Sequence, residues 1–351
     1  MNNFIIVDEE DINFIWDTIQ GQQVIFHPTI APNGFFDRDL FLESKKNKPF
    51  ILFLDRNILI SLLKFCENGS LKNKGESQLV GLIMAWAEIN DIAISAGLAV
   101  KERATQLHSQ ESGLIELQKF QEVFSAYPGQ LWLKVAEGQL TEIPRTKYSM
   151  TPATNITVDY SDGGDHYDMA VASLLHIVKL HLDKSITAVD KVKEFFQWMY
   201  DNLLICEYLL VYAAMLFTGQ ESIKAPKNAN SNDLDKIVAG CENQAWDISY
   251  LTNWSTLYSN TDDYDEEFLF ATNDILLKRI FINKNAPNGL NGLLFELFSR
   301  RDYDQLMDYI EEKMLNRIKP VFGDNPKEYF HEVINQEKEQ LAYMLKDKQD
   351  S

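Results

Sequence analysis

A short apolar run that ends on an aspartate constrains the fold of this chain more than any other feature. In "FILFLDRNILISLLKF", Phe50 to Phe65, five apolar residues predict a buried strand, and the apolar pattern resumes at helical spacing from Ile58. Asp55, between them, has two interpretations. It is a helix N-cap, since Asp is a preferred capping residue, or it is a metal ligand at the carboxyl end of a strand, where open α/β sheets place their sites.

The segments that follow predict an α/β fold with a parallel sheet. "QLVGLIMAWAEIN" is typical of a buried helix, residues 91–95 have strand character, and a further helix begins after Gly97. Strand, helix, helix, strand and helix in that order are typical of parallel α/β architecture. A second apolar strand, "FLFATND", also ends on an aspartate, Asp274.

Charge and cysteine usage restrict the classes of function. The net charge of −19 argues against broad binding to a polyanion, so a nucleic-acid contact would need a local basic patch or bound cations. The three widely spaced cysteines form no zinc pattern and are typical of reduced, mostly buried residues, which indicates a cytoplasmic protein. The most apolar stretch, residues 203–217, is shorter than the roughly 20 residues that cross a bilayer, so it predicts a core helix and no membrane contact.

Carboxylates gather at the predicted ends of several elements. Asp55 and Asp274 end strands, Glu102 lies on the helix after the second strand, and Asp247 lies on the helix that precedes the Asp274 strand. Four converging carboxylates would repel one another unless cations lay between them, and hard oxygen ligands favour Mg²⁺ or Mn²⁺. Such a site activates water for in-line phosphoryl displacement. The competing interpretation is that these acids are helix caps and solvated surface.

Three motifs resemble those of the PIN-domain nucleases. "LDRN" is similar to the first Asp-x-Asn of that family, "ISAGLAVKE" looks like its strand and glutamate-bearing helix, and "ATND" resembles its Thr-Asn-Asp. The acid in "NQAWDISYL" matches the remaining position. The resemblance implies metal-dependent RNA cleavage, with metal-binding, catalytic acids Asp55, Glu102, Asp247 and Asp274 and supporting residues Asn57 and Thr272.

The same resemblance requires a large insertion, because the segment between Glu102 and Asp247 is far longer than in a compact PIN domain. The resemblance to PIN domains covers residues 50–65, 91–105 and 234–280, which together are under half the chain. The predicted organisation is an N-terminal extension (1–48), a PIN-like core (49–110 and 234–285), a mostly helical insertion (111–233) and C-terminal helices (286–351).

Alternatives stay open for the third acid and for the function. Asp168, in "DGGDHYD", competes with Asp247, although the glycine pair favours a turn with one Asp capping the next helix. Ribonuclease activity is favoured. A DNA structure-specific nuclease, with single-stranded DNA as substrate, and a catalytically silent protein that binds a partner through its acidic helical regions are the alternatives. Lysines that precede the first strand (residues 45, 46 and 48) or follow its helix (72 and 74) are predicted to place positive charge near the site, as are Lys278, Arg279 and Lys284.

Overall fold

The computed structural model describes residues 7–259, 265–315, 317–318, 320, 322–323 and 325–350, so the first six residues of the predicted extension lie outside it. The chain forms two compact units. The sheet unit contains residues 1–163 and 254–274, and the helical unit contains residues 164–253 and 275–351. Among the described residues the protein is mostly helical, with one small mixed sheet, so the α/β class is confirmed in this coarse form.

The sheet has four strands in the order β1-β4-β2-β3. β2 (Phe50–Leu54) pairs in parallel with both β3 (Ala93–Ser95) and β4 (Glu267–Ala271), as the sequence predicts. β1 (Ile25–Phe26) pairs antiparallel with β4, which makes the sheet mixed and not wholly parallel. This strand lies in the predicted N-terminal extension, and two residues are too few to show an alternating pattern.

β2 and β4 end at the same level. Leu54 lies opposite Ala271, and the Asp55 amide donates a hydrogen bond to the Ala271 carbonyl over 3.0 Å. The next residues of the two strands, Asp55 and Thr272, therefore emerge side by side at the carboxyl edge of the sheet.

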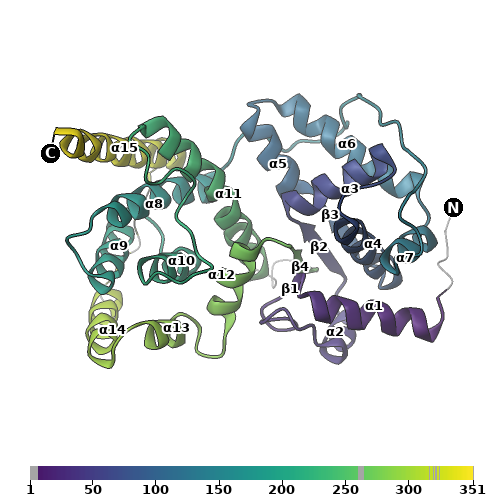
Figure 1. Cartoon of the computed structure of the whole chain (residues 1–351), viewed down its shortest axis with the longest axis horizontal. Coiled ribbons are helices and arrows are strands. Elements are labelled where there is room, and N and C mark those ends of the chain that lie inside the picture. Colours follow the sequence, from purple (N-terminus) through teal and green to yellow (C-terminus); the bar gives the residue numbers. More distant parts are fainter. Residues whose placement is uncertain are drawn as a thin grey trace. The chain divides into compact units, whose positions relative to one another are not determined.

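Opposite faces of the sheet carry different residues because side chains alternate along a strand. Phe50, Leu52 and Leu54 join one core with seven helices (Figure 1). On the alternate positions, the Phe53 ring contacts the Phe268 ring, and the Trp254 ring lies 6.2 Å from that of Phe270. The seven helices are α1 (Glu9–Gln22), α2 (Arg38–Lys45), α3 (Arg56–Asn68), α4 (Lys74–Ile89), α5 (Gly97–Gln106), α6 (Gln110–Ala126) and α7 (Gly129–Ala136).

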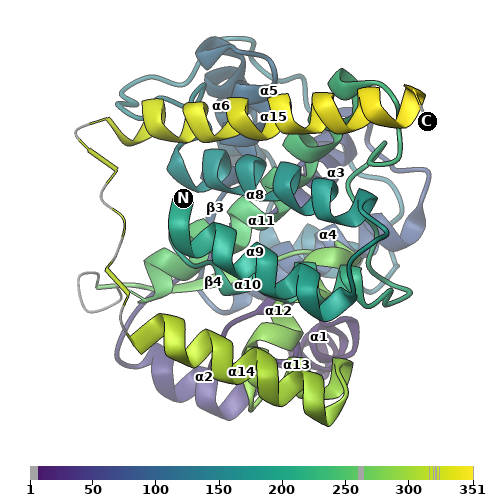
Figure 2. The same ribbon diagram turned by 90° about the vertical axis from the view of Figure 1, so that its left-hand side faces the viewer.

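The helical unit is built around α8 (Asp165–Leu182), most of whose residues are buried. Figure 2 shows α15 (Pro326–Asp350) lying along α8, with α9 (Ala188–Asn202) and α10 (Glu207–Phe217) on the other side. Buried Glu337 of α15 is fully paired: it accepts hydrogen bonds from Lys179 and Trp198, and its second contact to α8 is with His176. The remaining helices are α11 (Leu234–Ser259), whose last residues belong to the sheet unit, α12 (Ile275–Asn285), α13 (Gly289–Leu297) and α14 (Arg300–Leu315).

The unit boundaries differ from the domain boundaries that the sequence predicts. Residues 111–163, assigned to the insertion, belong to the sheet unit, because α6 and α7 bury Phe120 and Trp132 in the same core as β2. The predicted extension also joins this unit, since Trp16 and Phe41 pack against Trp86. An amphipathic pattern predicts that a helix has a buried face but does not identify the surface that covers it.

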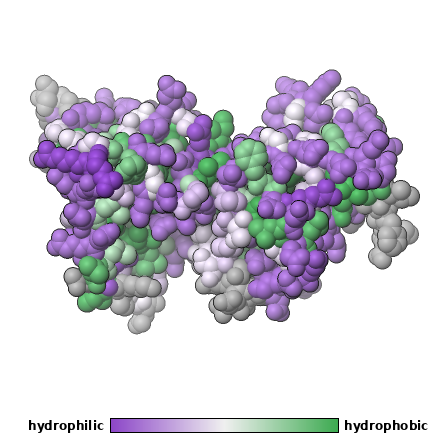
Figure 3. Space-filling view, turned by 90° about the horizontal axis from the view of Figure 1, so that it is seen from below, coloured by the Kyte–Doolittle hydropathy of each residue, from purple (hydrophilic) through white to green (hydrophobic). Residues whose placement is uncertain are grey.

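The surface is mostly hydrophilic in the view of Figure 3, with hydrophobic residues in small scattered patches. Among the residues that the structure describes, no helix combines the length and apolar character that a membrane span requires. All three cysteines are free thiols; Cys66 and Cys241 are buried and Cys206 is partly exposed.

Candidate functional site

Asp55 begins helix α3 and is the best-defined residue of the candidate site. Its backbone is extended (φ −71°, ψ 167°), and its Oδ1 accepts a hydrogen bond from the Ile58 amide over 2.8 Å. The capping interpretation is therefore confirmed. A cap is normally a surface feature, whereas the Asp55 residue is only 1% exposed. Capping alone does not explain why this carboxyl group is buried.

Thr272 ties the two strand ends together. Its hydroxyl donates a hydrogen bond to Asp55 Oδ2 and accepts one from the Asp274 amide over 3.0 Å. Thr272 is itself 1% exposed, and its own amide bonds to the Val24 carbonyl. The Thr-Asn-Asp segment is thus hydrogen-bonded to Asp55 through a buried hydroxyl. The predicted supporting role of Thr272 at a metal site stays a prediction.

The electrostatics of this edge disfavour ionised Asp55. Burial raises the pKa of the Asp55 carboxyl to about 6, and the negative charge of Asp274 adds to the shift. Hydrogen bonds from Thr272 and from the backbone of Ile58 and Asn57 lower the pKa, but they do not offset burial. Because burial and the charge of Asp274 disfavour the ionised Asp55 carboxylate, a cation that reaches it stabilises the ionised form.

Arg56 is a functional candidate to which no sequence motif assigns a role. Its guanidinium donates to both carboxylate oxygens of Glu116 on α6, with Nη2 2.9 Å from Oε1, and to the Ala99 carbonyl on α5 over 3.3 Å. The Arg56 and Glu116 side chains are 12% and 16% exposed. Arg56 therefore fixes α5 and α6 against the start of α3. The sequence feature that could have pointed to Arg56 is its position directly after Asp55, the aspartate that ends the strand.

Asn57 and Glu102 occupy more exposed positions. The Asn57 residue is exposed, and only its backbone amide acts on Asp55. Glu102 is half-buried in the second turn of α5, not the first, and its Oε1 accepts a hydrogen bond from Gln106 over 2.9 Å. The metal-binding role of Glu102 stays a prediction.

The two candidates for the third acid both belong to the helical unit. Asp247, on α11, is half-buried near Tyr212, whose pKa is raised by burial first and then by the charges of Cys241 and Asp247. Asp168, on α8, is buried, with Oδ2 3.6 Å from His331 Nε2. Gly164 occupies the N-cap of α8 with φ 78°, so the expected aspartate cap before this helix is wrong.

No group of three or more His, Cys, Asp or Glu side chains in the described part of the chain is arranged to hold one metal ion. The arrangement that is present is a pair, Asp55 and Asp274, joined through Thr272. Its oxygen donors are of the type that Mg²⁺ and Mn²⁺ prefer.

The lysines predicted near the acids from the segments before β2 and after α3 lie elsewhere in the sheet unit, while the predicted role of Lys278, Arg279 and Lys284, on α12, stays a prediction. Residues 45–48 precede the amino end of β2, whereas Asp55 follows its carboxyl end. Lys45 bonds to the Asn90 carbonyl and Lys46 pairs with Glu43. Lys72 and Lys74 follow the carboxyl end of α3, the helix whose amino end Asp55 caps. The order of residues along the chain already places these lysines at the far ends of the strand and the helix, so closeness in sequence does not bring their charge to Asp55.

Comparisons with known proteins add no identity to this geometry: the family models, the curated proteins and the solved structures all gave no match to the chain.

Proposed function

We propose that the chain is a PIN-like, metal-dependent nuclease whose favoured substrate is RNA. One observation carries the proposal: buried Asp55, at the end of β2, is hydrogen-bonded through Thr272 to the segment that holds Asp274. A mere cap gains nothing from burial beside a second acid, because each feature raises the free energy of the charged form. In a metal ligand both features are compatible with the ionised form, because a bound cation offsets their cost.

The residues at this edge fit a hard divalent cation. The two Asp55 oxygens together accept hydrogen bonds from the Ile58 and Asn57 amides and the Thr272 hydroxyl, and they keep lone-pair capacity for a further partner. Asp274 supplies a second carboxyl group close enough to raise the pKa of Asp55. Asp55 and Asp274 would hold the ion, and Glu102, in the same unit, is the predicted additional ligand.

A bound Mg²⁺ or Mn²⁺ would supply Lewis acidity and an activated water for attack on a phosphodiester. The chain itself supplies orientation. The Ile58 amide and the Thr272 hydroxyl fix the two oxygens of Asp55, and burial excludes competing water from that side. Arg56 holds α5, the helix that bears Glu102, through the Ala99 carbonyl.

Metal-dependent unfolding tests the proposal directly. We expect Mn²⁺ to raise the melting temperature of the wild type, by on the order of 5 °C near saturation, because the ion binds only the folded state. Asp55→Asn with Asp274→Asn removes this response. Asp17→Asn with Asp308→Asn, a pair of exposed aspartates, keeps it and controls for the change in net charge.

Hydrolysis of end-labelled RNA completes the test. We expect cleavage with Mn²⁺ or Mg²⁺, none with EDTA, and loss of cleavage in the Asp55/Asp274 variant only. Faster cleavage of structured or single-stranded DNA than of RNA would favour the DNA nuclease. If Mn²⁺ neither raises the melting temperature nor supports cleavage of the RNA, the metal site does not exist.

A second candidate function is a catalytically silent protein that binds a partner. The observation that favours it is the lack of a third acidic side chain beside Asp55 and Asp274 in the described residues. The net charge of −19 would then select a basic partner surface. This function predicts a folded protein that is indifferent to divalent ions.

A further inference from the structure

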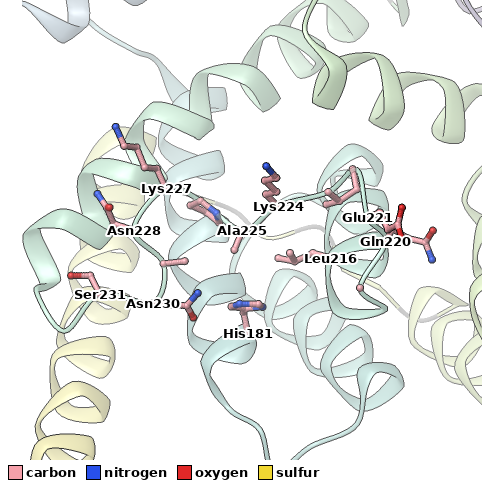
Figure 4. A pocket seen from close by; sticks show the side chains of 14 residues that line it. His181, Leu216, Gln220, Glu221, Lys224, Ala225, Lys227, Asn228, Asn230 and Ser231 are labelled. Carbon is pink, nitrogen blue, oxygen red and sulfur yellow. The ribbon is translucent and has the colours of Figure 1, made fainter.

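A pocket of about 640 Å³ lies within the helical unit, at the carboxyl end of α10 and the loop that follows it. Figure 4 shows Lys224 and Lys227 projecting from this loop, with Asn230 beside His181 of α8. Its volume falls within the range of about 300–1,000 Å³ that is usual for small-molecule sites. This loop, residues 219–233, lies at the end of the segment that the sequence predicts to be a mostly helical insertion.

The two lysines carry positive charge that the protein does not neutralise. Both are exposed, and in the described parts of the chain neither Lys224 nor Lys227 forms an ion pair. One acid, exposed Glu221, also lines the pocket. The chain as a whole has a net charge of −19 and repels anions. Two lysines without an ion-pair partner make this pocket locally positive, and a local positive charge is what an anion needs in order to bind to such a chain.

The loop that presents these lysines is held in place by its backbone. The Tyr212 hydroxyl donates to the Lys224 carbonyl over 2.9 Å, and buried Ile223 and Ala229 anchor the two sides. Gly240 of α11 permits the closest approach, because a Cβ added there would lie 1.8 Å from the Lys227 carbonyl oxygen. The lysine backbones are therefore preorganised, and binding has to order only their side chains.

The end of α10 does not repel an anion as a free helix carboxyl end would. In its last turn, the Ala214 carbonyl accepts a hydrogen bond from the Thr218 amide, the Met215 carbonyl from the Gln220 amide and the Leu216 carbonyl from the Gly219 amide. Gly219, with φ 72°, makes this closure possible. Three carbonyls of the last turn are thus paired with backbone amides and do not face the pocket as free acceptors.

We infer that this pocket binds the phosphate group of a nucleotide, with Lys224 and Lys227 as the charge partners. Asn228, Asn230 and Gln220 line the same pocket and offer amide donors and acceptors that suit a base or ribose. The phosphate comes from a free nucleotide or from the backbone of a nucleic acid. The inference stands apart from the acidic edge of the sheet unit and does not require catalysis.

Binding measured in EDTA tests the inference without the metal site. Fluorescence anisotropy follows a fluorescein-labelled single-stranded RNA, and calorimetry follows adenosine 5′-monophosphate, each at low salt. We expect Lys224→Gln with Lys227→Gln to weaken binding about tenfold, since two phosphate contacts are lost. Lys64→Gln with Lys346→Gln removes two exposed lysines outside the pocket and is expected to change binding less than twofold.

The two probes separate the sources of the phosphate. Loss of affinity for both probes assigns the pocket to nucleotides in general, and loss for RNA alone assigns it to the nucleic-acid backbone. Equal behaviour of the pocket pair and the control pair, or no binding of either probe by the wild type, overturns the inference. Because EDTA removes divalent ions, none of these outcomes depends on whether the chain is a nuclease.

Discussion

Asp55 has both carboxylate oxygens in hydrogen bonds, yet it is buried near a second acid, and the consequence is a dependence of stability on pH. Its pKa of about 6 in the folded protein exceeds the ordinary value of 3.8. The folded state therefore holds this proton more tightly than the unfolded state does. Without metal, the residue costs no stability below pH 4, and the cost grows as the pH rises from about 4 to 6.

We expect Asp55→Asn to stabilise the metal-free protein at pH 7. The shift corresponds to about 3 kcal/mol of unfolding free energy, of which loss of hydrogen-bond geometry in the amide will cancel a part. Urea unfolding in EDTA at pH 4, 5, 6 and 7 measures the difference between the variant and the wild type, which should grow across this range. Asp17→Asn controls for the lost charge. A difference in unfolding free energy that does not vary with pH would show that the pKa of Asp55 is not raised in the folded protein.

At the scale of elements, Arg56 links the starts and middles of three helices. It spans α3, α5 and α6 through the Ala99 carbonyl and the Glu116 carboxylate. Arg56→Lys keeps the charge but cannot reproduce the fork of two parallel hydrogen bonds. If the chain is a nuclease, we expect this variant to lower kcat more than it raises KM, because α5 bears Glu102 and shifts relative to Asp55.

The same variant is expected to lose about 1–3 kcal/mol of unfolding free energy, as is Glu116→Gln. Urea unfolding of both single variants and the double variant gives the coupling energy, which should exceed about 1 kcal/mol for residues in contact. Arg103→Lys, an exposed arginine on α5, is the control. Additive losses would contradict the link between the helices.

The helices and strands around Asp55 and Arg56 were predictable one by one from the sequence, but the contacts between them were not. The strand before Asp55, the strand that leads to Asp274, and helix α4 were predictable, because each is a run with clear periodicity. That Asp55 and Thr272 are neighbours depends on the register Leu54 to Ala271, which joins segments distant in the chain. The role of Arg56 depends on α6 in the same way. Neither pairing leaves a local pattern, so a single sequence does not specify it.

At the scale of the whole chain, the net charge of −19 sets opposite effects of salt on folding and on binding. Monovalent salt screens the repulsion among acidic residues, so we expect the melting temperature in EDTA to rise between low and moderate NaCl. We expect the proposed nucleic-acid binding to weaken over the same range, because salt competes with the inferred lysine–phosphate contacts.

The steepness of that fall distinguishes a local phosphate site from a broad basic surface. For single-stranded RNA the slope of log K against log salt is about −0.7 per phosphate neutralised, so Lys224 and Lys227 together give about −1.4. Anisotropy titrations of labelled RNA at several NaCl concentrations in EDTA measure it. A slope steeper than about −3 would require contacts with many more cations than the pocket presents. A slope near −1.4 is what a chain this acidic permits, since its overall field opposes every further phosphate that approaches.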